Sequence, residues 1–394
     1  MKRITQNIAI ALCSLGMSLA VCEVAARLIL PPPMAVKVTS AALKPSEQPQ
    51  QEVEGTDGSI NSVLIWGGKH GVRLRPNVTG HIRNHTLSKQ DVIIRTNSIG
   101  LRGGEVPPRQ PGQLRILLIG DSIMFGDYVD ETLTISSLLE AKLKSLGYSD
   151  VIVMNAGLPG MNFAEEYHHY QEVAKGADPD LVVVGMYLND AQEAQKFYAK
   201  TLRFPFSASR FLTWFAQRFQ LLDSSVLFSK VSLSSTSADW KEEFRAGRNL
   251  HSADYLGTRD GFDFEIYNAS NDFGLAWNPV AWKQIAEIAK TFTEHVRQNN
   301  TKFATFILPV AMQVYAKQEI LSTYPQEQFS KLFNSLKVPH FDLLPTLRER
   351  SSGFTRQEMF YDHCHYKAEG NQLVADTLAD WLVKDGVLPS PQSK

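Results

Sequence analysis

A serine in the segment Gly120-Asp121-Ser122-Ile123 and a histidine in Asp362-His363-Cys364-His365 are the residues best suited to chemistry in this 394-residue chain. A serine hydroxyl becomes a nucleophile when an imidazole takes its proton. A carboxylate that contacts the imidazole fixes its tautomer and stabilises its charged form. These residue types predict that Ser122 attacks an ester carbonyl, with His365 as its base and Asp362 as the orienting acid.

Two further segments offer hydrogen-bond donors for the negative charge that such an attack creates. The loop 155–160 contains Gly157, whose backbone N–H is not shielded by a side chain, and the segment 185–190 places the Asn189 side-chain amide after an apolar run. Donors aimed at a developing oxyanion stabilise the transition state. We therefore predict an oxyanion hole made by the N–H groups of Ser122 and Gly157 and by Asn189, and this chemistry needs no metal or cofactor.

Simpler structural roles compete with these assignments. Ser122 or Asp121 could cap the helix that follows. The run 363–365, with the histidine pair 168–169, could form a zinc site, but adjacent ligands are poorly spaced and the sequence lacks a His-Glu-x-x-His or paired Cys-x-x-Cys motif. Cys364 is a weak candidate nucleophile, because its neighbouring histidine already serves the serine.

The elements that must position these residues alternate between buried strands and helices. Continuous apolar runs, which suit strands covered on both faces, lie at 116–119, 151–154, 181–184 and 303–308. Helical spacing of apolar residues occurs at 135–146, 279–299 and 368–384. The alternation predicts an α/β domain over 113–385, with a doubly wound parallel sheet flanked by helices. In such a sheet the segments that carry the chemistry meet at the carboxyl ends of the strands.

This set of segments resembles the SGNH (GDSL) hydrolase family. The Gly-Asp-Ser, the loop glycine, the Gly-x-x-x-Asn-Asp and the Asp-x-x-His occur here in the family's order, and the segment 97–102 is similar to the one that precedes the first strand in exported members. One departure is that three residues, rather than one, separate Asn189 from Gly185. The resemblance implies a flavodoxin-like sheet of the SGNH hydrolase type and an esterase with the triad Ser122, His365 and Asp362.

The first thirty residues predict export from the cytoplasm. Lys2 and Arg3 precede an uncharged, mostly apolar run at 4–22, which is just long enough to span a bilayer. Basic residues stay on the cytoplasmic side, so a signal anchor over 1–30 would place the rest of the chain outside, in the periplasm or at the cell surface. The small residues at 18–20 leave cleavage of a signal peptide as the alternative.

Three other segments have distinct compositions. Residues 31–59 begin with three prolines and are rich in Pro, Gln, Ser and Glu, which predicts a flexible stem. Residues 60–112 contain short β-type runs such as 92–94, which predict an extended lead-in packed on the main domain. Residues 196–277 hold about twice the 10% average share of aromatic residues, which indicates an insertion with its own structure. Its rings at helical spacing over 211–222 could be core, a lid or a membrane-facing surface.

Composition limits the classes of function. The formal net charge is −1 and no long Lys/Arg tract occurs, which disfavours a nucleic-acid partner. Three cysteines provide no disulfide framework. We therefore predict a membrane-anchored serine esterase for acyl groups on an extracytoplasmic glycan or lipid. An O-acyltransferase of an envelope polysaccharide, using the same acyl-enzyme, is the alternative, and a catalytically silent binding module is the third hypothesis.

Overall fold

The computed structural model describes residues 2–29, 49–66, 72–191, 211, 272–315 and 322–391, and the chain divides into two compact units. The described part of the first unit is helix α1 (Lys2–Ile29) together with Phe211. Glu23 of α1 accepts hydrogen bonds from the Arg27 side chain at 2.7 Å and from the backbone N–H of Phe211 at 3.0 Å. Among the described residues, no helix combines the length and apolarity that crossing a membrane requires. The expectation of a transmembrane anchor at 1–30 is not confirmed.

The second unit is built on a five-stranded sheet in the order β10-β9-β8-β6-β7, with every neighbouring pair parallel. Its strands are β6 (Leu114–Gly120), β7 (Val151–Gly157), β8 (Leu181–Tyr187), β9 (Lys302–Leu308) and β10 (His340–Asp342). The four apolar runs of the sequence form β6 to β9, and their side chains are almost all buried, as a sheet covered on both faces requires. The prediction of a parallel α/β sheet is confirmed. β10 was not expected, because it has only three residues, all half-buried.

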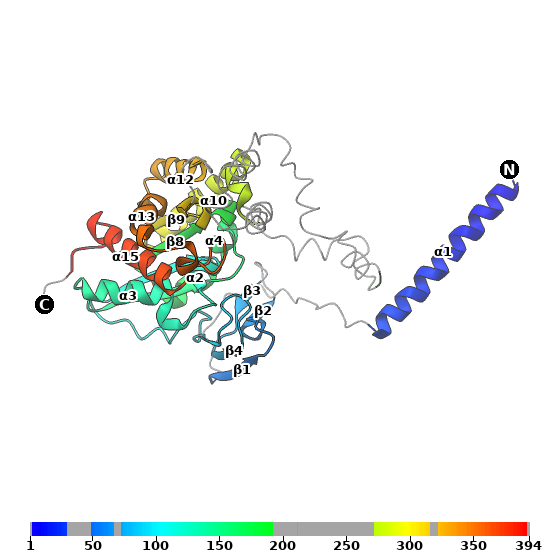
Figure 1. Cartoon of the computed structure of the whole chain (residues 1–394), viewed down its shortest axis with the longest axis horizontal. Coiled ribbons are helices and arrows are strands. Elements are labelled where there is room, and N and C mark those ends of the chain that lie inside the picture. The colour runs from blue at the N-terminus through cyan, green and yellow to red at the C-terminus, as the bar shows by residue number, and fades with distance from the viewer. Residues whose placement is uncertain are drawn as a thin grey trace. The chain divides into compact units, whose positions relative to one another are not determined.

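Helices cover both faces of this sheet (Figure 1). One layer contains α3 (Ile135–Ser145), α13 (Leu343–Arg350) and α15 (Ala368–Lys384), which pack on one another. The other contains α4 (Phe163–Ala177), α10 (Pro279–Gln298) and α12 (Tyr324–Ser335). The expected helices at 135–146, 279–299 and 368–384 are therefore present within one or two residues. Gly147, with φ +99°, follows the end of α3 in the left-handed conformation that favours glycine at a helix end.

An N-terminal module, residues 49–112, precedes the main sheet. Its three-stranded sheet has the order β1-β4-β5, from β1 (Gln51–Gly55), β4 (Val78–Ile82) and β5 (Val92–Arg95). A hairpin of β2 (Leu64–Trp66) and β3 (Val72–Leu74) lies beside it. β1 pairs in parallel with β4, so the expected flexible stem cannot extend to residue 59. The polar, exposed sequence of β1 gives no alternation signal, because its pairing stabilises it rather than its burial.

The expected insertion at 196–277 lies mostly outside the described residues, and so do the rings at 212–222. Its last part is described, and includes a short helix, η5 (Gly274–Trp277). Phe273, Ala276 and Trp277 are buried there. This last part therefore contributes to the core of the domain, just before α10.

Candidate active site

Ser122 stands at the junction of a buried strand and a short helix. Asp121 separates it from Gly120, the last residue of β6, and it begins α2 (Ser122–Phe125), which is capped at its end by Gly126 in the left-handed conformation with φ +69°. The cap of α2 is Asp121, whose side chain accepts a hydrogen bond from the N–H of Ile123 at 2.9 Å. The capping role considered for Ser122 therefore belongs to Asp121, and the Ser122 hydroxyl is available for chemistry.

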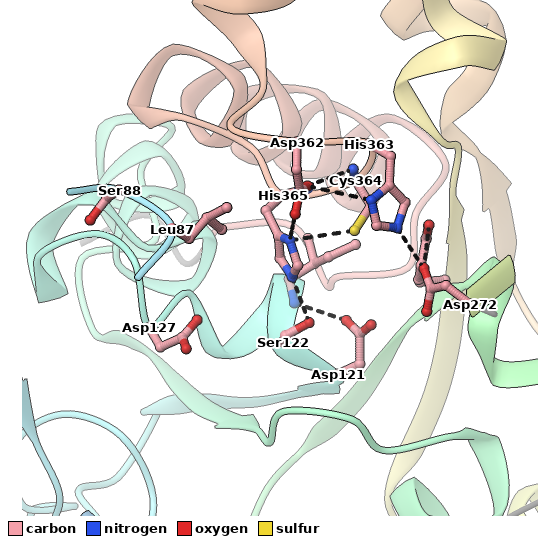
Figure 2. A network of polar contacts seen from close by, with 12 residues as sticks. Leu87, Ser88, Asp121, Ser122, Asp127, Asp272, Asp362, His363, Cys364 and His365 are labelled. Carbon is pink, nitrogen blue, oxygen red and sulfur yellow. Dashed lines mark hydrogen bonds and ion pairs between the residues drawn. The ribbon is translucent and has the colours of Figure 1, made fainter. Parts of the chain in front are cut away.

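Ser122, His365 and Asp362 lie in one line of hydrogen bonds (Figure 2). Ser122 Oγ is 2.8 Å from His365 Nε2, and His365 Nδ1 is 2.7 Å from Asp362 Oδ2. The other carboxylate oxygen of Asp362 accepts the backbone N–H groups of Cys364 and His365, at 2.9 and 2.8 Å. The structure thus brings together the three residues that the sequence analysis selected, although 240 positions separate Ser122 from Asp362 in the chain.

The surroundings of His365 favour its protonated form. Burial alone would lower the pKa of this imidazole, but the charge of Asp362, the hydrogen bond to Asp362 and the charges of Asp127 and Asp121 together raise it to about 9. Burial would likewise raise the pKa of Asp362, yet the charge and hydrogen bond of His365 hold it well below its usual range. The resting pair is an imidazolium beside a carboxylate, and the neutral base forms mainly at alkaline pH.

The structure corrects the expected role of Gly157. Its backbone N–H already donates to Asn155 Oδ1 at 2.9 Å, so it is not available to an oxyanion. A Cβ at this position would lie 2.2 Å from the backbone nitrogen of Phe125, which shows that Gly157 is needed for close packing of β7 against α2. The second glycine of the same loop, Gly160, is exposed, and its N–H has no hydrogen bond within the described chain. Gly160 is therefore the better candidate donor to the oxyanion. The sequence feature that could have indicated it is the presence of a second glycine in the loop 155–160.

Asn189 hydrogen-bonds Asp121, the residue that precedes the nucleophile in the chain. It lies in the short helix η3 (Leu188–Ala191) that follows β8, and its Nδ2 donates to Asp121 Oδ2 at 3.2 Å. A second hydrogen on the same nitrogen remains for a substrate oxygen. Burial raises the pKa of Asp121 to about 6, against the hydrogen bonds from Ile123 and Asn189. The three-residue spacer after Gly185 therefore still brings the amide to the expected edge of the sheet.

A second histidine–carboxylate pair lies beside the first, and it could not be predicted from the sequence. His363 Nε2 is 2.7 Å from Asp272 Oδ2, and the hydroxyl of Tyr187 donates to the same oxygen at 3.1 Å. The ring of Phe273 stacks on His363 with a centroid separation of 5.7 Å. Asp272 lies in the last part of the insertion at 196–277, and no local sequence pattern could have linked it to His363. These contacts place the Nε2 atom of His363 on Asp272, whereas that of His365 lies on Ser122.

The residues considered for a zinc site form two groups in the described chain. Asp272, His363 and Cys364 make one group, and Asp362, Cys364 and His365 make the other, with all potential ligand atoms of a group within 4.8 Å of one another. In each group the carboxylate already hydrogen-bonds the imidazole. The pair 168–169 lies on α4 and belongs to neither group. Burial raises the pKa of the Cys364 thiol well above its usual value, which disfavours the thiolate and hence this cysteine as nucleophile.

Two more carboxyl groups are buried behind the site. Glu166 of α4 and Asp190 of η3 are 0% and 2% exposed. Neither carboxyl oxygen of Glu166 has a hydrogen-bond partner within the described residues, and Asp190 accepts the backbone N–H of Tyr187 at 2.9 Å. Burial is the main cause that raises the pKa of both well above the usual range, and nearby negative charges add to it: Asp121 and Glu165 at Glu166, and Glu166 and Asp121 at Asp190. The pair therefore holds protons under conditions in which surface carboxylates are ionised.

Comparisons with known proteins give low-identity structural likenesses. No protein-family model and no curated protein matches this chain. It is similar to an alpha/beta hydrolase enzyme from the metagenome of Lake Arreo in Spain, with 11% identity, a TM-score of 0.40, and coverage of 70% of this chain and 97% of that one. It is also similar to an acetyl xylan esterase, with 13% identity, a TM-score of 0.39 and coverage of 68% and 100%. A third likeness, with 11% identity, a TM-score of 0.36 and coverage of 68% and 100%, is to a Desulfitobacterium hafniense protein assigned to the G-D-S-L family of lipolytic proteins. The solved structures to which this chain is similar thus include an acetyl xylan esterase and a protein of the G-D-S-L family.

Proposed function

We propose that this protein is a serine esterase in which Ser122 is the nucleophile, His365 the general base and Asp362 its orienting acid. The observation that carries the proposal is the continuous path from Ser122 Oγ through His365 to Asp362, with steps of 2.8 and 2.7 Å. Both distances lie within the reach that proton transfer between a nucleophile and its base requires. The side chain of His365 is 19% exposed, so a substrate can approach the reacting atoms.

The mechanism follows from these positions. Neutral His365 takes the hydroxyl proton as Ser122 Oγ bonds to the ester carbonyl carbon, and Asp362 stabilises the imidazolium that forms. The carbonyl oxygen becomes an oxyanion, and the N–H of Ser122, the amide of Asn189 and the N–H of Gly160 are its donors. Collapse breaks the ester C–O bond, and the imidazolium protonates the departing alkoxide. Water, activated by the same base, then releases the acid from the acyl-serine.

The test is covalent labelling joined to turnover. The full chain should react with a fluorophosphonate probe at Ser122 and hydrolyse p-nitrophenyl esters, and Ser122→Ala should lose both activities. Ser145→Ala is the matched control, because Ser145 is an exposed serine on α3 whose hydroxyl only bonds the carbonyl of Lys142. Labelling that persists at another serine in Ser122→Ala would overturn the assignment. Labelling without hydrolysis, followed by turnover when a sugar acceptor is added, would replace the esterase with an acyltransferase.

We further propose that the substrate is an acyl ester on a glycan or lipid outside the cytoplasm. Support comes from Lys2 and Arg3 before the apolar run 4–22, which is typical of export signals. The N-terminal module is described from residue 49, so alkaline phosphatase fused after residue 48 leaves the module out of the fusion. An active reporter in the carbonate-washed membrane fraction supports an anchor, and a soluble active reporter supports a cleaved signal peptide. A stable but inactive fusion would refute export.

A further inference from the structure

The N-terminal module forms hydrogen bonds with the turn 126–130, which follows helix α2. The guanidinium of Arg102 donates to the carbonyl oxygens of Phe125 and Val129, each at 2.6 Å, and to that of Gly126. It also lies 5.2 Å from the centre of the Phe125 ring. Arg102 is only 4% exposed, so these carbonyls replace the water that a cation would otherwise bind. A buried arginine from the module therefore closes the carboxyl end of α2.

A second residue of the module contacts the same turn. His85, which is 3% exposed, accepts the backbone N–H groups of Leu87 and Ser88 on Nδ1, at 3.2 and 3.4 Å. Because Nδ1 is an acceptor, the proton of the neutral ring is on Nε2. Nε2 lies 3.4 Å from Asp127 Oδ2. Figure 2 shows Leu87, Ser88 and Asp127 to one side of the Ser122–His365 pair.

The turn 126–130 also contacts His365, the proposed catalytic base. The ring of Tyr128, which is 1% exposed, meets His365 edge-on with a centroid separation of 5.1 Å, and meets Tyr361 at 5.4 Å. Its neighbour Asp127 is one of the carboxylates whose charge raises the pKa of His365. Both the packing and the electrostatic environment of the imidazole therefore include groups on this turn.

We propose that Arg102 and His85 are positioning residues of the reaction, which hold the turn 126–130 so that Tyr128 packs on the ring of His365 and the carboxylate of Asp127 acts on it. This inference rests on the proposed function only in taking His365 as the base. Several elements around His365 contribute titratable groups. These groups are Asp121, Asp127, Tyr128, Asp362, His363 and Cys364. Of these, Asp127 and Tyr128 lie on the turn that Arg102 and His85 contact.

The first test measures the ionisation of His365 directly, without need of turnover. In the full chain labelled at histidine, NMR follows the imidazole of His365, assigned with His365→Gln. Asp127→Asn should lower its titration midpoint, with at least a threefold smaller protonation constant, and His85→Ala should lower it in the same direction. Asp130→Asn is the control, because Asp130 is an exposed acid on the same turn and should leave the midpoint unchanged.

The second test measures positioning in turnover. Arg102→Lys keeps the charge but cannot reach three carbonyls, so kcat should fall at least tenfold with KM within twofold. Arg95→Ala is the control, because Arg95 belongs to the same module but forms an exposed ion pair with Glu131, which contributes little. His85→Gln, which keeps a polar nitrogen beside Asp127, should recover most of the loss of His85→Ala, and it tests the idea if Arg102→Lys does not fold.

The outcomes separate this inference from the proposed function. An unchanged His365 midpoint in Asp127→Asn, or wild-type kcat in both a folded Arg102→Lys and His85→Ala, overturns the inference. A wild-type chain that hydrolyses no ester and labels with no probe, while the midpoint still shifts in Asp127→Asn, overturns the esterase and leaves the positioning of His365 by the module intact.

Discussion

The raised pKa of His365 makes a quantitative prediction about the pH dependence of activity. A general base acts only when it is unprotonated. With a pKa of about 9 rather than the ordinary value, the neutral imidazole amounts to about 1% at pH 7 and to half at pH 9. The value of kcat/KM should therefore rise about tenfold per pH unit up to pH 8, and about fiftyfold between pH 7 and pH 9. A profile that levels off near 6.5, as the residue type alone predicts, is not expected.

The assay is initial-rate hydrolysis of a short-chain p-nitrophenyl ester at constant ionic strength, with Ser122→Ala as the blank for alkaline hydrolysis. Asp362→Asn removes the charge and the hydrogen bond that offset burial, so its midpoint should move down toward the acid side. Its kcat should also fall by about four orders of magnitude, since the imidazole loses its orienting partner. A wild-type midpoint between 6 and 7 would refute the reasoning, because burial would then outweigh the surrounding carboxylates.

Four substitutions test the remaining assignments. Ser122→Ala should abolish probe labelling, measured by gel fluorescence. His363→Ala should reduce kcat far less than His365→Ala, because its Nε2 bonds Asp272; a larger loss in His363→Ala would reverse the two roles. Asn189→Ala should lower kcat by about a hundredfold or more with little change in KM, the usual cost of one lost oxyanion donor. Gly157→Ala should lower the free energy of unfolding by about 1–3 kcal/mol, seen in urea titrations, because its Cβ would meet the backbone of α2; wild-type stability would contradict that packing.

The core of the fold could be predicted because its strands are buried on both faces. A parallel strand covered by helices must be apolar at every position, so 116–119 and 181–184 are visible as continuous runs. The strand β1 lacks such a run, since Gln51, Glu52 and Glu54 are exposed. It is held by backbone pairing with β4 and by ion pairs of Glu52 with His81 and of Glu54 with Arg83. Sequence patterns report burial, and a strand held mainly by polar contacts leaves no such pattern.

The triad could be predicted because chemistry restricts its residue types and because parallel strands deliver their ends to one edge. The choice between Gly157 and Gly160 could not be made from the sequence, because it depends on which N–H the side chain of Asn155 occupies. The pair Asp272 and His363 could not be predicted either, since 91 positions separate its members and no motif includes Asp272. Which donor is free, and which acid faces which imidazole, are properties of the packed state.

The protonated acids behind the site link the stability of the fold to pH. Burial raises the pKa values of Glu166 and Asp190 above the values that these groups have in the unfolded chain. Their contribution to the stability of the folded state is therefore fully present at pH values below the unfolded-state pKa. That contribution is lost as the pH rises through the raised values and a charge must form inside the domain. A rise in pH thus deprotonates His365, which catalysis needs, and also ionises Glu166 and Asp190, which weakens the fold. We therefore expect the decline of activity at high pH to follow loss of structure, and to shift with temperature and time of incubation as an unfolding event does.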